Sequence, residues 1–137
     1  MTRQVVAATS EIPPGARRRI EIDGRGIVVF NLDGEYFALL DRCPHNGGSL
    51  AAGIVTGLLQ SAAPGDYSYT RRGEIIRCPW HGWEFDIRTG RSFCTGIRAR
   101  ARPYPVTVEP GAAIAEGPYR AETVPVRVED NYVVVDA

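Results

Sequence analysis

The residues with the greatest capacity for chemistry are three cysteines and two histidines, and four of these five lie in two short units. The first unit is Cys43-Pro44-His45 and the second is Cys78-Pro79-Trp80-His81. Thiolate and imidazole are metal-binding donors, and each unit holds one of each at a short separation. Ordinary buried loop positions would also suit Cys and His, but chance is a poor account of this clustering. The pattern predicts one metal centre built from both units.

The distribution of the donors bears on the kind of metal. Structural zinc sites accept two Cys and two His, but zinc fingers keep like ligands together, with two Cys in one unit and two His in the other. Here each unit supplies one Cys and one His. That arrangement suits a binuclear iron cluster in which one iron binds both thiolates and the other binds both imidazoles. A zinc-stabilised structural module stays open as an alternative.

Residues 43–48 (Cys-Pro-His-Asn-Gly-Gly) and 78–86 (Cys-Pro-Trp-His-Gly-Trp-Glu-Phe-Asp) resemble the two cluster-binding loops of Rieske 2Fe–2S proteins. The resemblance spans about residues 15–109, and it is closest to Rieske ferredoxins and to Rieske domains of ring-hydroxylating oxygenase systems. It implies one 2Fe–2S cluster per chain. The implied ligands of the inner iron are Cys43 and Cys78, and those of the outer, more exposed iron are His45 and His81.

The elements that must position these loops are predicted to be strands. Val and Ile total 23 against 6 Leu, with 15 Gly and 10 Pro, which favours short strands and many turns. The resemblance implies an all-β fold of three small antiparallel sheets, with the cluster held at one tip by two loops. We expect a single domain over residues 1–137, with a cluster-binding subdomain at about 42–96 and a base at about 1–41 and 97–137.

Local patterns refine this expectation. Asp23-Gly24 and Asp33-Gly34 predict tight turns between alternating strands. Strands are also expected in the later part of the chain, at residues 74–77, 83–87, 106–108, 124–128 and 132–135. Short helices are expected at 48–52 and 111–115. Residues 57–72 and 110–122 look like insertions, and the first has turn chemistry at its centre.

Three smaller expectations concern residues around the two units. We expect Cys94 to be a thiol that binds no metal, and Asp86 to act as a turn acceptor near Thr89-Gly90. The natural rim of a docking surface is Asn46, Pro79 and Trp80. In respiratory Rieske proteins a Ser hydroxyl follows the second loop's His-Gly, where this chain has Trp83, and a disulfide crosses the cluster. A lower potential is therefore expected here.

Several function classes are excluded by composition. Arg totals 16, Asp and Glu total 16, and no Lys occurs, so bulk positive charge offers no basis for binding nucleic acid. No apolar stretch is long enough to span a bilayer, and we expect a soluble, cytoplasmic protein with no membrane partner. A Rieske oxygenase would need two further His for a mononuclear iron. The chain also has no Gly-x-Gly-x-x-Gly fingerprint of a reductase.

These exclusions leave an electron carrier with no catalytic activity of its own. We expect it to pass one electron from a flavin-dependent reductase to a terminal oxygenase or a similar redox partner. The alternative from another class is a non-catalytic small subunit of a larger reductase complex.

Overall fold

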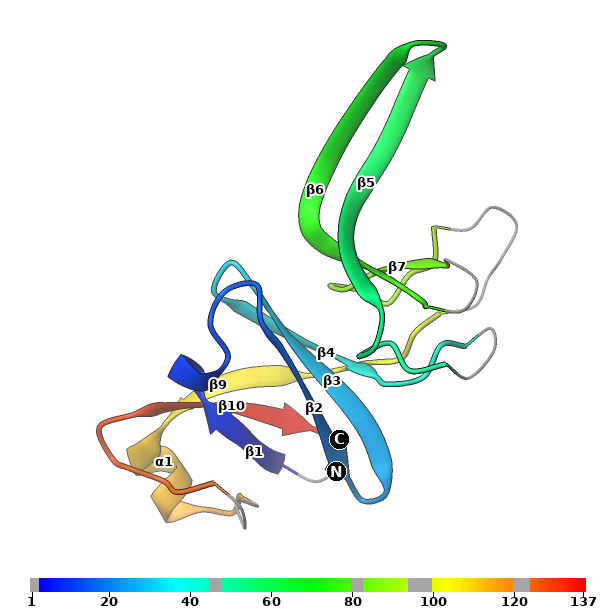
Figure 1. The fold of residues 1–137 in the computed structure, drawn as a ribbon. Coiled ribbons are helices and arrows are strands. Elements are labelled where there is room, and N and C mark those ends of the chain that lie inside the picture. Colours follow the sequence, from blue (N-terminus) through cyan, green and yellow to red (C-terminus); the bar gives the residue numbers. More distant parts are fainter. Residues whose placement is uncertain (1–2, 45–47, 80–82, 94–99, 120–123) are drawn as a thin grey trace.

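The computed structural model describes residues 3–44, 48–79, 83–93, 100–119 and 124–137, and it confirms the all-β prediction (Figure 1). These residues form three antiparallel sheets. The first sheet has the order β1 (Arg3–Ala8), β10 (Asn131–Asp136), β9 (Val106–Pro110). The second has the order β2 (Arg17–Ile22), β3 (Arg25–Leu32), β4 (Glu35–Leu40), β8 (Pro103–Tyr104). The third has the order β5 (Ile54–Ala63), β6 (Asp66–Arg77), β7 (Glu84–Asp86).

Two tight turns set the register of the second sheet, as the sequence predicted. Asp23 and Gly24 have φ of 50° and 79°, and Asp33 and Gly34 have φ of 56° and 96°. Positive φ at both central residues is the requirement of a primed two-residue turn, which Asp-Gly meets at low cost. The strands therefore pair directly across each turn, from β2 into β3 and from β3 into β4.

Strand β3 lies between two hydrophobic cores and contributes side chains to both. Ile27 and Val29 pack into a core with residues of the first sheet, such as Val133. Val28 and Phe30 point to the other face and pack into a second core. Successive side chains of a strand point to opposite faces, so one run of apolar residues serves both cores. The second core is the one that contains the two cysteines discussed below.

Residues 57–72, which the sequence marked as an insertion, are the distal part of a long β-hairpin. β5 and β6 pair along their length and project away from the body of the molecule (Figure 1). The turn at Pro64-Gly65 lies where turn chemistry was predicted, and Gly65 has φ of 84°. Only the lowest pairs, such as Val55 with Ile76, lie beside β7. Tyr67 is 67% exposed on the projecting part.

Three local predictions fared differently. The expected short helix at 111–115 is confirmed as α1 (Gly111–Glu116), and a 3-10 turn, η1, covers Thr9–Glu11. The expected helix at 48–52 is wrong, because this segment forms turns. The expected strand at 124–128 is also wrong. There the Tyr132 hydroxyl donates to the Pro125 carbonyl and accepts from the Arg127 N–H, so a side chain takes the place of a neighbouring strand.

The two ends of the described chain lie together, because Arg3 of β1 pairs with Asp136 of β10 (Figure 1). No helix among the described residues is both long and apolar enough to cross a membrane.

Candidate metal centre

The two cysteines of the predicted centre lie in one buried core. Cys43 follows β4 and Cys78 directly follows β6. They are 0% and 1% exposed, and both belong to the core that includes Phe30 and Phe85. The fold therefore brings together two thiols that are 35 positions apart in the chain. The histidines of the two units, His45 and His81, lie outside the described residues.

The two loops that begin at these cysteines are closed in the same way. The Cys43 N–H donates to the carbonyl oxygen of Gly48 over 2.7 Å, and the Cys78 N–H donates to the carbonyl oxygen of Trp83 over 2.8 Å. In each loop the acceptor lies five positions after the cysteine. Each histidine of the sequence units therefore falls inside a loop whose two ends are bonded together.

Asp41 anchors the first loop from behind. Its carboxylate accepts the Ala51 N–H at 2.7 Å, the Ser49 hydroxyl at 2.9 and 3.0 Å, and the Arg19 Nε–H at 2.6 Å. The side chain is only 1% exposed, so these bonds replace water around a charged group. The hydrogen bond to Asp41 raises the pKa of the Arg19 guanidinium above its ordinary value.

Asp41 also holds the turn that stands in place of the expected helix after the first loop. Its carboxylate holds the Ala51 N–H, and the Gly53 N–H returns to the Leu50 carbonyl as a turn. The role of Asp41 was not predicted from the sequence. The sequence did contain a signal for a side-chain hydrogen bond across the first loop. An acidic residue stands two positions before Cys43, and a hydroxyl residue, Ser49, follows the loop.

Asp86 supports the second loop, as the turn acceptor that the sequence predicted. Its carboxylate accepts the Arg88 N–H at 3.0 Å, and its carbonyl accepts the Gly90 N–H at 2.7 Å. The same carboxylate pairs with Arg71 of β6 at 3.0 Å. This hydrogen bond to Asp86 raises the pKa of the Arg71 guanidinium. The root of the projecting hairpin is thereby tied to the strand that follows the second loop.

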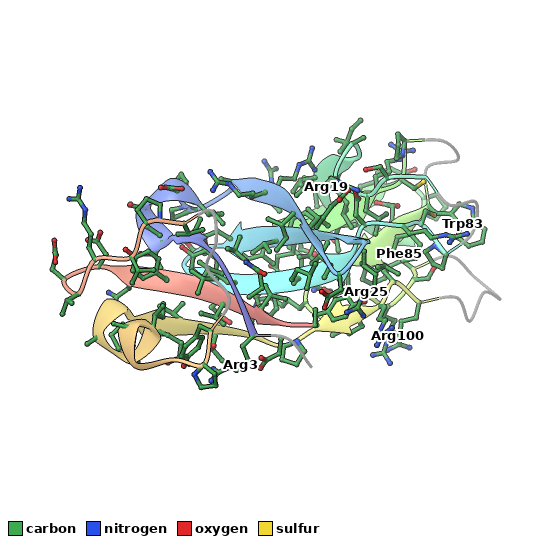
Figure 2. All side chains as sticks on the ribbon, turned by 90° about the horizontal axis from the view of Figure 1, so that it is seen from below. Arg3, Arg19, Arg25, Trp83, Phe85 and Arg100 are labelled. Atoms are coloured by element: carbon green, nitrogen blue, oxygen red, sulfur yellow. The ribbon has the colours of Figure 1, made fainter. Side chains whose placement is uncertain are left out.

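Two aromatic side chains pack beneath the loops. Phe85 is fully buried in the core that holds the cysteines, and Trp83 is half-buried against the same core. Figure 2 shows both residues at one end of the molecule. This placement agrees with the expectation that Trp83 is a packing aromatic. Of the predicted docking rim, Pro79 is exposed, whereas Asn46 and Trp80 lie outside the described residues, as does Cys94.

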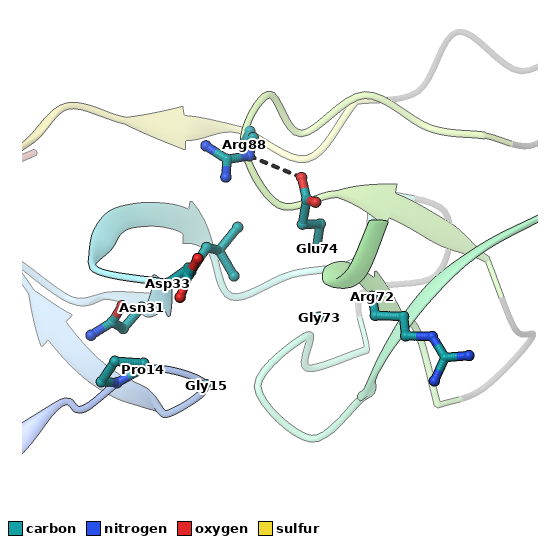
Figure 3. A pocket seen from close by; sticks show the side chains of 9 residues that line it. Pro14, Gly15, Asn31, Asp33, Arg72, Gly73, Glu74 and Arg88 are labelled. Carbon is teal, nitrogen blue, oxygen red and sulfur yellow. Dashed lines mark hydrogen bonds and ion pairs between the residues drawn. The ribbon is translucent and has the colours of Figure 1, made fainter. Parts of the chain in front are cut away.

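A separate hollow of about 320 Å³ lies between the Asp33-Gly34 turn and the hairpin root (Figure 3). Arg88 donates to Glu74 across it at 3.0 Å, which raises the pKa of the Arg88 guanidinium. None of the residues that line this hollow belongs to either loop. It is therefore a seam between two sheets and not part of the predicted metal centre.

The donor set fits an iron–sulfur cluster. Burying a thiolate in an apolar core is costly unless a cation neutralises it, and two thiols share this core. Soft sulfur donors select zinc or iron–sulfur clusters, not hard oxygen-preferring ions. Fold and donors together define a small all-β protein with two equivalent cysteine-bearing loops at one end.

Comparison with known proteins identifies the family. The family model of the Rieske [2Fe-2S] domain matches residues 2–106. The chain is 31% identical over 111 residues to a 3-phenylpropionate/cinnamic acid dioxygenase ferredoxin subunit from Photorhabdus laumondii subsp. laumondii, covering 81% of this chain and 90% of that protein. The chain therefore belongs to the family of Rieske [2Fe-2S] domains, whose cofactor is a 2Fe–2S cluster.

Solved structures agree on the fold. The ferredoxin of carbazole 1,9a-dioxygenase from Nocardioides aromaticivorans IC177 superposes with a TM-score of 0.65 at 21% identity, covering 98% of this chain and 97% of that one. A second similar structure is a complex of reduced oxygenase and oxidized ferredoxin in carbazole 1,9a-dioxygenase. It has a TM-score of 0.60 at 23% identity and covers 96% of this chain and 91% of that chain. The expected Rieske-type fold is thus confirmed.

Proposed function

We propose that the protein is a one-electron carrier whose 2Fe–2S cluster is bound by Cys43, His45, Cys78 and His81. The observation that carries this proposal is the burial of both cysteines in one core, each at the head of a loop closed by the same backbone bond. Membership of the Rieske family supports the cofactor. The cluster, when bound, supplies the uptake and release of a single electron.

The chain's own residues hold the ligands in place. Cys43 and Cys78 would bind the inner iron from the core, and the two histidines would bind the outer iron from within the loops. Asp41 and Asp86 each fix the backbone that follows one loop, through bonds that involve no reacting group. Ligands held by such supporting hydrogen bonds keep one geometry, and this is the requirement of a preorganised site.

The electron's source and destination follow from the relatives. Similar proteins include a ferredoxin subunit of a dioxygenase and a complex of ferredoxin with oxygenase. We therefore propose a flavin-dependent reductase as the donor and a terminal oxygenase as the acceptor. The carrier would have no catalytic activity of its own. A cytoplasmic location belongs to the same proposal, because a reducing compartment keeps Cys43 and Cys78 as thiols.

The domain division predicted from the sequence is part of this proposal. The third sheet and both loops would form the cluster-binding subdomain, at about 42–96, and the first two sheets would form the base. The base is built from residues on both sides of that segment, and its sheets include β1, β2, β9 and β10.

A spectroelectrochemical titration of the anaerobically purified protein tests the function. We expect the visible absorbance of the oxidised protein to bleach in one reversible step with a one-electron slope. Reoxidation by one equivalent of an outer-sphere oxidant should restore the spectrum. A protein with no visible absorbance, or one that bleaches without recovery, would contradict the proposal and favour the zinc-stabilised module.

A further inference from the structure

The zero net charge conceals a strong division of charge along the chain. Residues 42–104, which contain both loops, carry nine arginines against four Asp and Glu, a formal charge of +5. The remaining residues, 1–41 and 105–137, carry seven arginines against twelve Asp and Glu, a formal charge of −5. The segment that contains both loops and extends to Tyr104 is therefore positive, and residues 1–41 and 105–137 together are negative.

Two of these arginines stand directly before the predicted ligands. Arg42 precedes Cys43 and Arg77 precedes Cys78. Both side chains are exposed, and neither forms an ion pair with any described residue. By contrast, Arg71 and Arg88 of the same segment are committed to Glu74 and to further carboxylates. Positive charge beside the loops is thus left available for a partner.

A cleft of about 400 Å³ beside the start of the first loop is lined by several arginines. We call it the arginine cleft. Its walls include Arg25, Arg42, Arg102 and Tyr104. The guanidinium carbons of Arg25 and Arg102 lie 5.7 and 5.0 Å from the centroid of the Tyr104 ring. Figure 2 shows Arg25 and Arg100 toward the same end of the molecule as Trp83.

The arginine cleft also contains an unused hydrogen-bonding group. Tyr104 is 7% exposed, and its buried hydroxyl has no hydrogen-bond partner among the described residues. A buried polar group without a partner is uncommon in a native protein. The single carboxylate on the cleft wall, that of Asp41, is occupied by Arg19, Ser49 and the Ala51 N–H. The cleft therefore offers guanidinium donors, and its lining residues leave no anion to receive them.

We propose that the arginine cleft, with Arg42 on its wall, forms the docking surface for an acidic face of a redox partner protein, with a partner carboxylate entering the cleft. Guanidinium groups bind carboxylates through paired hydrogen bonds. A charged patch also steers a partner of opposite charge and fixes its orientation. Docking here places the partner against the residue next to Cys43. The inference rests on the proposed electron-carrier function.

An acidic protein is a better fit than a nucleic acid. A long polyanion would extend beyond the cleft and meet residues 1–41 and 105–137, whose formal charge is −5. Sequence-independent binding to nucleic acid depends on many phosphate contacts, and these require extended positive charge. A compact acidic patch on a protein can contact the arginine cleft without contacting the negatively charged residues.

Stopped-flow oxidation of the reduced holoprotein by two small ions tests the surface. The probes are hexacyanoferrate(III), an anion, and hexaammineruthenium(III), a cation. At low salt, Arg42→Gln and Arg102→Gln should each slow oxidation by the anion and speed oxidation by the cation, by about two- to fivefold. A change in driving force would move both rate constants in the same direction. The matched control is Arg127→Gln, which removes an exposed arginine from residues 105–137 and should leave both rates unchanged.

A protein-sized probe extends the test to docking. Reduction of the oxidised protein by the hydroquinone of an acidic flavodoxin should slow as salt rises, and it should slow further in the Arg42 and Arg102 variants. Equal effects on both small ions, or flavodoxin kinetics that ignore these arginines, would overturn the inference. Arginine-dependent binding of a short duplex DNA with unchanged flavodoxin kinetics would also overturn it. A protein without any oxidation transient would instead defeat the proposed function.

Discussion

The Cys78 N–H donates to the carbonyl oxygen of Trp83 over 2.8 Å, and this bond closes a loop around the second Cys-Pro-x-His unit. The first loop repeats the relationship between Cys43 and Gly48 at 2.7 Å. Two segments far apart in the sequence thus have the same local structure. In each, a buried cysteine begins a loop, and its N–H bonds to the carbonyl of the residue that ends the loop. This equivalence is the structural reason to treat both units as halves of one site.

Substitution of the two buried cysteines should have matching effects. Cys43→Ser and Cys78→Ser should each lose or alter the cluster, because serine replaces a soft thiolate donor with a poor ligand for iron in this cluster. Visible absorbance and iron per chain measure the result. The matched control is Cys94→Ser, which should keep full iron content. Loss of iron in the control would show that the ligand set is wrong.

Removing the charge of Asp41 should loosen the first loop. Asp41→Asn weakens the bonds to Arg19, Ser49 and the Ala51 N–H, and we expect the free energy of unfolding to fall by about 1–3 kcal/mol. Chemical denaturation followed by circular dichroism measures the change, and loss of visible absorbance on mild heating should come earlier. Asp33→Asn is the control, because Asp33 is an exposed turn residue whose positive φ asparagine tolerates. Equal stability of the two variants would contradict the anchoring role.

The distal hairpin should be dispensable for the cluster. Replacing residues 59–69 by an Asn-Gly turn keeps the pairs that lie beside β7 and removes the projecting part. Two-stranded ribbons are marginally stable on their own, so we expect the free energy of unfolding to change by less than about 1 kcal/mol. The visible spectrum and iron content should be unchanged. A truncated protein that folds but holds no iron would show that the hairpin is needed for cluster binding, against this prediction.

The potential should lie in the low part of the Rieske range, which spans about −150 to +300 mV. The chain has Trp83 where respiratory relatives carry a hydroxyl, and Trp83 is half-buried against the core. Fewer hydrogen bonds to sulfur stabilise the added electron less. The potential should also be constant near neutral pH and fall in alkaline solution, because the proposed histidine ligands are more acidic when the cluster is oxidised. Protein-film voltammetry over a range of pH measures both, and a midpoint near the top of the range would contradict this reasoning.

The base of the fold could be predicted from the sequence because its strands have at least one face in a core, and β3 has both. Asp23-Gly24 and Asp33-Gly34 stand between alternating runs, and the hairpins follow directly. The projecting strands of 57–72 escaped prediction because side chains described on their distal part, such as Tyr67 and Tyr69, are exposed. Without a buried face, no alternation of apolar residues marks a strand. Only its turn, at Pro64-Gly65, left a local sign.

The sequence was enough to predict the metal-binding residues. It was not enough to predict the residues whose hydrogen bonds hold the loops in place. Cysteines and histidines are rare in this chain, so their spacing stands out. Asp41 is one of 16 acidic residues, and its importance comes from contacts with Arg19 and Ala51 that depend on the fold. Likewise, segment 124–128 alternates like a strand, but the Tyr132 hydroxyl takes up its backbone groups. Such tertiary contacts override local propensity.

The iron and sulfide content of the protein decides whether the two loops hold a 2Fe–2S cluster. Protein purified without oxygen should contain about two irons and two acid-labile sulfides per chain, and it should be red-brown. On reduction it should give a rhombic electron paramagnetic resonance signal with a low mean g value. Cys43→Ser measured beside it should lack that signal, and Cys94→Ser should keep it. A colourless protein with one zinc per chain would contradict the account.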